Sequence, residues 1–284
     1  TDPNNPTEMA EAKLLPNAQK ALADYLGFGA GGASGFSYVL SVYTHQITMR
    51  EYPDKYGTEG VNLNTAWTAI YTDAIRNCEE IIKNAEEPGN TLYSGIAKIL
   101  KAYAYSQLVD VFGDIPFSES NDYQGGAGFG APAFDQGKDI YPQLFALLDE
   151  GIADLNNTTA ANPNKPGSDD LIYGGKAASW INAANTIKLK LYNQARLVQD
   201  VSGPVNELLS GGKLIGSTAA SFAFPYGTAS SPDERSPFFA DYFATQRSIN
   251  ISPWFYEIMK GYNMKDVNGM TKDFNVFSGI KDPR

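Results

Sequence analysis

The feature that most constrains the fold is a helical period that persists through much of the chain. Apolar residues recur every three or four positions, the spacing that gathers them on one face of an α-helix. Four long segments show it, at residues 63–85, 91–112, 140–155 and 176–198. Because such stripes are buried by packing helices against one another, the pattern predicts an all-α fold.

The lengths of the connections indicate that these helices form hairpins. Pro88-Gly89 ends the first segment, and the next begins about three residues later, which requires two antiparallel neighbours. The segments 140–155 and 176–198 form a second hairpin with a longer connection. Two shorter helices, at 16–26 and 36–47, flank the glycine-rich turn Gly27–Gly35 and make a third pair. No repeat of fixed length is visible.

The composition and the hydrophobic periodicity of the sequence change after Val201. Residues 211–253 are rich in Gly, Ser, Pro and aromatic residues and have no sustained helical period, so we expect short strands and loops there, followed by a helical piece at 254–262. The predicted organisation is a helical-hairpin scaffold over 1–201 and a loop-rich subdomain over 202–284.

Composition excludes several classes of function. The 22 Lys and Arg residues against 32 Asp and Glu residues give a net charge of -10, and no basic block is present, so nucleic acid is not an expected partner. With Cys78 and His45 as the single residues of their kinds, neither an internal disulfide nor a His/Cys zinc cluster can form. No calcium-loop motif occurs, so we expect no metal, and we expect no cofactor. No apolar run is long enough for a helix to span a bilayer.

The possible catalytic motifs have simpler interpretations. Gly27–Gly32 matches G-x-G-x-x-G but follows a helical pattern, whereas the dinucleotide-binding motif follows a strand. His45 has no nucleophile motif beside it, and Cys78 lies on an apolar stripe that is typical of core. Carboxylates in loop contexts leave open a helical glycoside hydrolase, because glycoside cleavage needs two facing acids. These candidates are Asp114, Glu119, Asp122, Asp233, Glu234 and Asp241.

Aromatic residues in the irregular part of the chain are the candidate ligand contacts. Only 19% of residues are charged, and rings in loops are not needed to fill a helical stripe. A flat ring on a loop offers a platform for the apolar face of a sugar or for a peptide side chain. We therefore predict that Phe224, Tyr226, Trp254 and Tyr256 contact ligand.

Several fragments together resemble a known family. The segment Ala97–Phe117, with its Phe112-Gly113-Asp114-Ile115-Pro116-Phe117 exit, resembles the signature helix of the SusD/RagB family of bacterial nutrient-binding lipoproteins. Further fragments fall in the matching order: Thr1–Pro6, Trp67 with Ile70-Tyr71, Trp180–Leu191, Pro253-Trp254-Phe255 and Asp282-Pro283-Arg284. Family members continue past the last of these, so the chain looks like an amino-terminal portion.

The resemblance implies a fold, a cellular location and a function. It implies a tetratricopeptide-like helical scaffold with a loop-rich subdomain, tethered to the outer membrane by a lipid on a cysteine upstream of residue 1 and facing the cell exterior. It also implies a non-catalytic protein that captures glycans for import through a SusC-like TonB-dependent transporter. A peptide-binding member of the family, the glycoside hydrolase and a scaffold that binds only protein remain as alternatives.

Overall fold

The computed structural model describes residues 9–29, 34–50, 63–120, 131–231, 233–245 and 249–261. The chain divides into two compact units. The first unit comprises Thr1–Ala23 and Trp67–Pro225, and the second comprises Asp24–Ala66 and Tyr226–Arg284. The division at residue 201 expected from the sequence remains a prediction.

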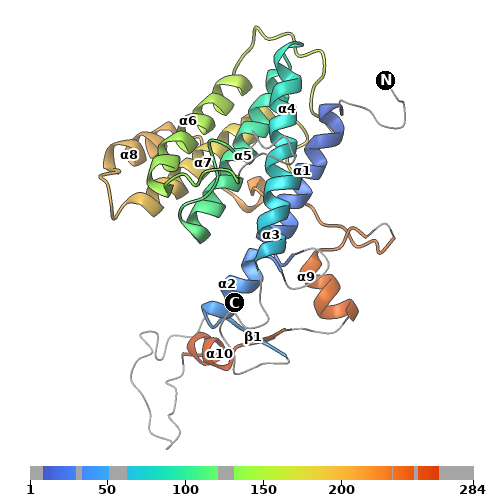
Figure 1. The fold of residues 1–284 in the computed structure, drawn as a ribbon, viewed down its shortest axis with the longest axis vertical. Coiled ribbons are helices and arrows are strands. Elements are labelled where there is room, and N and C mark those ends of the chain that lie inside the picture. The colour runs from blue at the N-terminus through green and yellow to red at the C-terminus, as the bar shows by residue number, and fades with distance from the viewer. Residues whose placement is uncertain are drawn as a thin grey trace, which may run out of the picture. The chain divides into compact units, whose positions relative to one another are not determined.

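The first unit is built of helices (Figure 1). In chain order they are α1 (Glu11–Leu26), α3 (Asn64–Ala69), the π-helical turn η1 (Ile70–Ile75), α4 (Arg76–Glu86), α5 (Thr91–Phe112), α6 (Gly137–Leu155), α7 (Ala177–Ala195) and α8 (Ser202–Gly211). The last turn of α1, from Asp24, and the first residues of α3, up to Ala66, belong to the second unit. The 3-10 turn η2 (Thr218–Ala220) follows them. The predicted all-α class is confirmed, because the described residues form one sheet of only two short strands.

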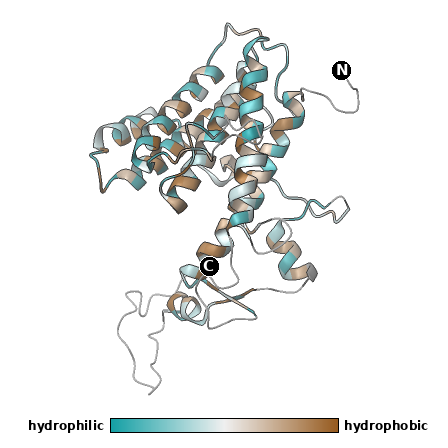
Figure 2. Ribbon diagram, viewed as in Figure 1, coloured by the Kyte–Doolittle hydropathy of each residue, from teal (hydrophilic) through white to brown (hydrophobic). Residues whose placement is uncertain are grey.

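Helix α5 is the central element of this unit. It packs against α4, α6 and α7, and residues around most of its circumference are buried, including Ile96, Ile99, Leu100 and Leu108. Along α4 and α6, by contrast, apolar and polar residues alternate at helical spacing (Figure 2). The neighbours of α5 therefore bury one stripe each, as expected for helices that cover a core.

Two glycines allow α5 and α6 to pack closely. A Cβ placed on Gly95 would lie 2.8 Å from both the Gly151 carbonyl oxygen and Leu155 Cγ. A Cβ on Gly151 would lie 3.0 Å from the Gly95 carbonyl oxygen. Each helix thus presents its glycine to the backbone of the other, and any larger residue would force the pair apart.

The first long helix predicted from the sequence, over 63–85, is interrupted by the π-helical turn. A π turn adds a residue to the helical turn, which shifts the phase of the buried stripe. Ala74 and Ile75 are both fully buried although they are adjacent, and the stripe then continues through Cys78 and Ile81. The buried stripe thus runs on from the π-helical turn into α4.

The connection from α6 to α7 is organised by Asp170. Its carboxylate accepts hydrogen bonds at 2.7 Å from Gln19 Nε2, Gly175 N and Trp180 Nε1. Asp170 is only 2% exposed, so these donors replace the water that a buried carboxylate would otherwise need. One side chain therefore holds α1, the connecting loop and α7 in register.

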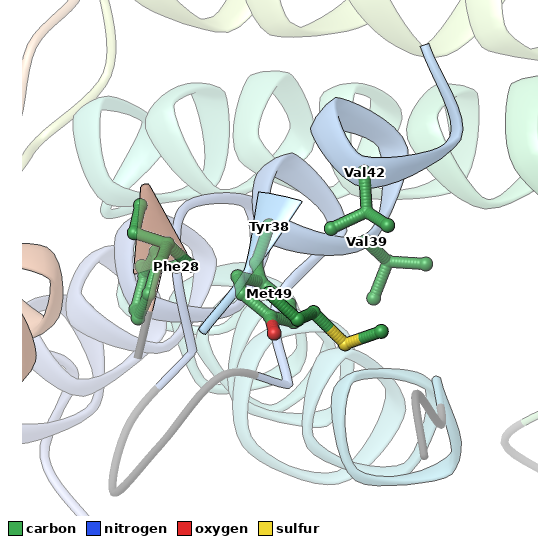
Figure 3. Close-up of a cluster of buried hydrophobic side chains, with 6 residues drawn as sticks. Phe28, Tyr38, Val39, Val42 and Met49 are labelled. Carbon is green, nitrogen blue, oxygen red and sulfur yellow. The ribbon is translucent and has the colours of Figure 1, made fainter. Parts of the chain in front are cut away.

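The second unit joins segments that are distant in the sequence. It contains α2 (Phe36–Tyr43), β1 (Ile47–Met49), α9 (Pro237–Phe239), the π-helical turn η3 (Ala240–Thr245), β2 (Ile249–Ile251) and α10 (Pro253–Met259). The strands pair antiparallel, with Ile47 opposite Ile251 and Met49 opposite Ile249. Figure 3 shows five members of its buried cluster, Phe28, Tyr38, Val39, Val42 and Met49, and Ile249 completes it.

Besides the π-helical turn, the observed helices differ from the predicted ones at three places. Helix α1 begins five residues before Pro16 and contains it, because Leu14, Leu15 and Ala18 form one buried stripe across the proline. The segment predicted as a helix to Ile47 ends at Tyr43 and turns through His45, at a φ of 58°, into β1. Helix α8 was not predicted, since none of its residues is buried and it has no complete apolar stripe.

Candidate functional site

The segment that carries Phe224 is attached to the first unit by its neighbour Phe222. The Phe222 ring lies 5.4 Å from that of Tyr103 and 5.7 Å from that of Trp180, in edge-to-face contacts. Phe222 therefore anchors the segment to the scaffold, and Phe224, two residues later, is half-buried.

Tyr226 has a structural partner in the second unit. Its hydroxyl donates a hydrogen bond of 2.8 Å to Asp24 Oδ1. Burial of the ring, together with the Asp24 carboxylate, raises the pKa of Tyr226 well above its usual value. The phenol therefore stays protonated at neutral pH, and its half-buried ring is held in one orientation.

Trp254 and Tyr256 are the more accessible of the predicted ligand contacts. Both lie on α10 and each is 44% exposed. Lys260 Nζ lies 5.4 Å from the centre of the Tyr256 ring, a cation–π distance that steadies the ring. Residues two apart on a helix point about 200° away from each other, so the two rings present separate surfaces.

The structure gives several of the candidate acids a role in the loops. Asp114 Oδ1 accepts a 3.0 Å hydrogen bond from Gly137 N, and Glu119 Oε2 accepts one of 2.9 Å from Ala133 N. Asp233 pairs with Arg235. Asp122 lies outside the described residues. These bonds favour loop structure over acid–base chemistry for the carboxylates that make them.

Cys78 is a core residue, and His45 lies in the turn before β1 at a φ of 58°. Cys78 is fully buried on α4, and burial raises the pKa of its thiol to about 12, so it is not a nucleophile at neutral pH. Where the structure describes the chain, no group of His, Cys, Asp and Glu side chains could hold a metal ion. In the same part of the chain, no helix is long and apolar enough to cross a bilayer.

The first unit contains a pocket that sequence reasoning did not find. Its volume is about 890 Å³, and it lies where the end of α5, the start of α6, the end of α7 and the start of α8 meet. Three rings line it, Tyr141, Phe145 and Tyr192. The Phe145 and Tyr192 rings stack with centroids 4.1 Å apart and planes 16° apart.

One ring of this pocket, Tyr141, is held in place by the carboxylate of Asp110. Tyr141 Oη donates to Asp110 Oδ1, while Asp110 Oδ2 accepts from Gln194 Nε2 at 3.3 Å. Burial and Asp110 raise the pKa of Tyr141, which keeps this donor protonated. The sequence contained one signal for the pocket: Tyr141, Phe145 and Tyr192 lie off the buried stripes of α6 and α7, where aromatic rings are not needed for the core.

Comparison with known proteins identifies the family. A family model described as "Starch-binding associating with outer membrane", SusD-like, matches residues 3–264. The chain belongs to the SusD-like family. The resemblance found in the sequence is thereby confirmed.

Solved structures share the fold of this SusD-like chain. A SusD/RagB family protein from Bacteroides thetaiotaomicron has a TM-score of 0.69 at 21% identity, with 89% of this chain and 51% of that one covered. A SusD homologue from Bacteroides fragilis has a TM-score of 0.65 at 18% identity, covering 89% and 51%. A chitin-binding SusD homologue from Flavobacterium johnsoniae has a TM-score of 0.67 at 19% identity, covering 88% and 52%.

The chain therefore spans about half the length of these similar structures. No curated protein sequence matches the chain.

Proposed function

We propose that this SusD-like chain captures oligosaccharides at the cell surface and delivers them, chemically unchanged, to a partner TonB-dependent outer-membrane transporter. The single observation that carries the proposal is the match of residues 3–264 to a family described as starch-binding and associated with the outer membrane. The fold shared with a chitin-binding homologue supports a glycan as the nutrient.

The side chains support capture by weak contacts that act together. Exposed rings such as Trp254 and Tyr256 offer apolar faces to the C–H side of a sugar ring. Hydrogen bonds to sugar hydroxyls compete with water, so each contributes only about 1 kcal/mol. Several such contacts have to act on one ligand, and because Trp254 and Tyr256 present separate surfaces, each ring would need other neighbouring groups as partners.

The cellular arrangement is part of the proposal. A lipid on a cysteine upstream of residue 1 would anchor the protein in the outer membrane facing the exterior, where it would work with a SusC-like transporter. The net charge of -10 and the absence of a basic block in the sequence support a partner other than nucleic acid.

Calorimetric titration of the protein with neutral oligosaccharides and short peptides tests this function. Each mixture is incubated for a long period, and the products are analysed. We expect saturable binding of an oligosaccharide that is recovered intact. Preferential binding of peptides would instead identify a peptide-binding member of the family, and cleavage products would indicate a glycoside hydrolase acting through loop carboxylates.

The proposed ligand contacts Phe224, Tyr226, Trp254 and Tyr256 are tested by substitution. Trp254→Ala is expected to weaken glycan binding about fivefold to tenfold, since stacked rings contribute about 1 kcal/mol or more. Tyr43→Ala is the matched control, because Tyr43 is 40% exposed in the same unit but is not a proposed contact. Equal affinity of the two variants would remove Trp254 from the site.

A further inference from the structure

We infer that the pocket enclosed by α5, α6, α7 and α8 is a second glycan subsite, one that takes an uncharged oligosaccharide. The inference rests on the proposed function, because it names a site and a ligand class within it. It concerns residues separate from Phe224, Tyr226, Trp254 and Tyr256, and the whole pocket lies within the first unit.

The size and lining of the pocket suit a small oligosaccharide. Its volume of about 890 Å³ lies in the range of ligand pockets, about 300–1,000 Å³. Tyr141, Phe145 and Tyr192 form one wall. Aromatic faces contact the apolar side of a sugar ring, and rings already held in position lose little entropy on binding.

The wall is preorganised by contacts that do not depend on ligand. Phe145 and Tyr192 stack on each other, and Tyr141 is held by Asp110. Lys190 Nζ lies 3.5 Å from Asp110 Oδ2, so the ammonium partly balances the charge of the carboxylate that holds Tyr141. Phe145 lies on α6 and Tyr192 on α7, so their stacking joins the two helices and restricts the rotation of both rings.

Two of the residues that line the pocket are glycines, Gly113 and Gly137. Gly113 ends α5 at a φ of 79°, a conformation that favours glycine. A Cβ on Gly137 would lie 3.1 Å from both the Gly113 carbonyl oxygen and Val109 Cγ1. Helix α6 can thus start directly against the end of α5, with Asp114 tied to Gly137 N at the edge of the pocket.

The rim carries amides that are available for hydrogen bonds. Gln136 and Gln199 line the pocket and are exposed. Their side-chain amides make no hydrogen bond with another described residue. An amide both donates and accepts, as a sugar hydroxyl does, so rings and amides together match a hydroxyl-rich ligand better than a purely apolar one.

The charges at the pocket disfavour an acidic ligand. Asp114 and Asp200 contribute carboxylates to the lining, against the single ammonium of Lys138. Asp200 Oδ1 accepts hydrogen bonds from Ser202 N and Oγ, which lower the pKa of its carboxyl and keep it ionised. A uronic acid or a sulfated sugar would meet this excess of negative charge, whereas a neutral sugar would not.

The test compares binding of three probes by calorimetry: the chitin tetrasaccharide, maltotetraose and the acidic tetragalacturonate. The double variant Gln136→Ala/Gln199→Ala removes the rim amides without disturbing the core. We expect it to bind the preferred neutral probe about fivefold to twentyfold more weakly. Gln143→Ala is the matched control, because Gln143 is exposed on α6 and lies outside the lining; its affinity should be unchanged.

A second variant addresses the wall. Tyr192→Ala is expected to weaken binding about tenfold, and its urea unfolding curve shows whether the fold is retained. If Tyr192→Ala does not fold, the double variant Gln136→Ala/Gln199→Ala alone tests the subsite, because both glutamines are exposed.

The outcomes separate this inference from the proposed function. Wild-type affinity in the amide double variant would overturn the subsite and leave glycan capture standing. Tetragalacturonate binding as tightly as the neutral probes would overturn the uncharged ligand class. Failure of the intact protein to bind either neutral probe, while peptides bind, would overturn both.

Discussion

Asp170 shows how much of the first unit depends on one side chain. Its carboxylate joins Gln19 on α1, Gly175 in the connecting loop and Trp180 on α7. No local sequence pattern reveals these bonds, because Gln19 and Asp170 are 151 positions apart. From the sequence alone, the α6–α7 connection is expected only to be a loop, and nothing distinguishes Asp170 from its other acids.

Replacement of Asp170 by alanine is expected to lower the free energy of unfolding by about 3 kcal/mol, because it leaves buried donors without an acceptor. Urea denaturation measures the loss. The control is Asp200→Ala at an exposed position, which should change the free energy of unfolding far less than Asp170→Ala does. A similar, small effect for both variants would mean that water satisfies the buried donors.

Cys78 illustrates a residue whose role was predictable. Its place on an apolar stripe indicated core, and the structure confirms it with complete burial. Burial raises the pKa of the thiol to about 12, so the thiolate fraction at about pH 8 is very small.

We expect Cys78 to resist Ellman's reagent at about pH 8 in the native protein and to react fully after unfolding in urea. The absorbance of the released product follows the reaction. The urea-unfolded sample is the control for reagent and thiol content. Rapid stoichiometric reaction without denaturant would contradict the burial of this thiol.

At the scale of elements, the α5–α6 pair depends on a close approach that helix propensity alone would not predict. Alanine is the better helix former, so Gly95→Ala would stabilise an isolated helix. In the folded protein its Cβ would lie 2.8 Å from the Gly151 carbonyl oxygen. Packing and propensity therefore have opposite effects at this position.

Packing is expected to dominate, so that Gly95→Ala lowers the free energy of unfolding by about 1–3 kcal/mol. Gly203→Ala in α8 is the matched control, because no atom lies within 4 Å of its Cβ position. There the same substitution should stabilise by up to about 1 kcal/mol. Equilibrium unfolding of both variants checks the predicted difference in sign.

The connection between α5 and α6 is closed by Asp135. Its carboxylate accepts hydrogen bonds from Ser118 N at 2.8 Å, Ser118 Oγ at 2.9 Å and Phe117 N at 3.0 Å. These bonds, that from Ser118 N first, hold the pKa of Asp135 below its usual range. The loop around Ser118 is therefore ordered by an ionised acid.

A lowered pKa in the folded state stabilises the protein above the unfolded-state pKa, and this contribution is lost as the pH falls through the folded-state pKa. We expect Asp135→Asn to unfold at a lower temperature than wild type at about pH 7, with the difference shrinking as the pH falls below the unfolded-state pKa and through the lowered folded-state pKa of Asp135. Thermal melts across this range measure it. A difference that does not depend on pH would show that shape, rather than charge, holds the loop.

At the scale of the whole molecule, a ligand that binds only the folded protein must stabilise it. At a hundredfold excess over its Kd, a captured oligosaccharide should add about 2.7 kcal/mol to the free energy of unfolding. Urea denaturation with and without the neutral oligosaccharide preferred in calorimetry measures this shift. Tetragalacturonate is the control for non-specific effects and should leave the midpoint unchanged.

Much of the fold was predictable because helices are local. Hydrogen bonds within a helix and its apolar stripe involve residues a few positions apart, so α5 was predicted over the residues that form it. The turn after α4 followed in the same way from Pro88-Gly89. The family likewise followed from short fragments that occur in order along the chain.

What only the tertiary structure decided involves residues that are distant in the sequence. The pairing of β1 with β2 and the bond from Tyr226 to Asp24 join positions about 200 apart. The pocket beside Tyr141 and Tyr192 needs the ends of four helices. Periodicity specifies which face of a helix is buried but not which other helix covers it, and that choice depends on how side chains fit together in three dimensions.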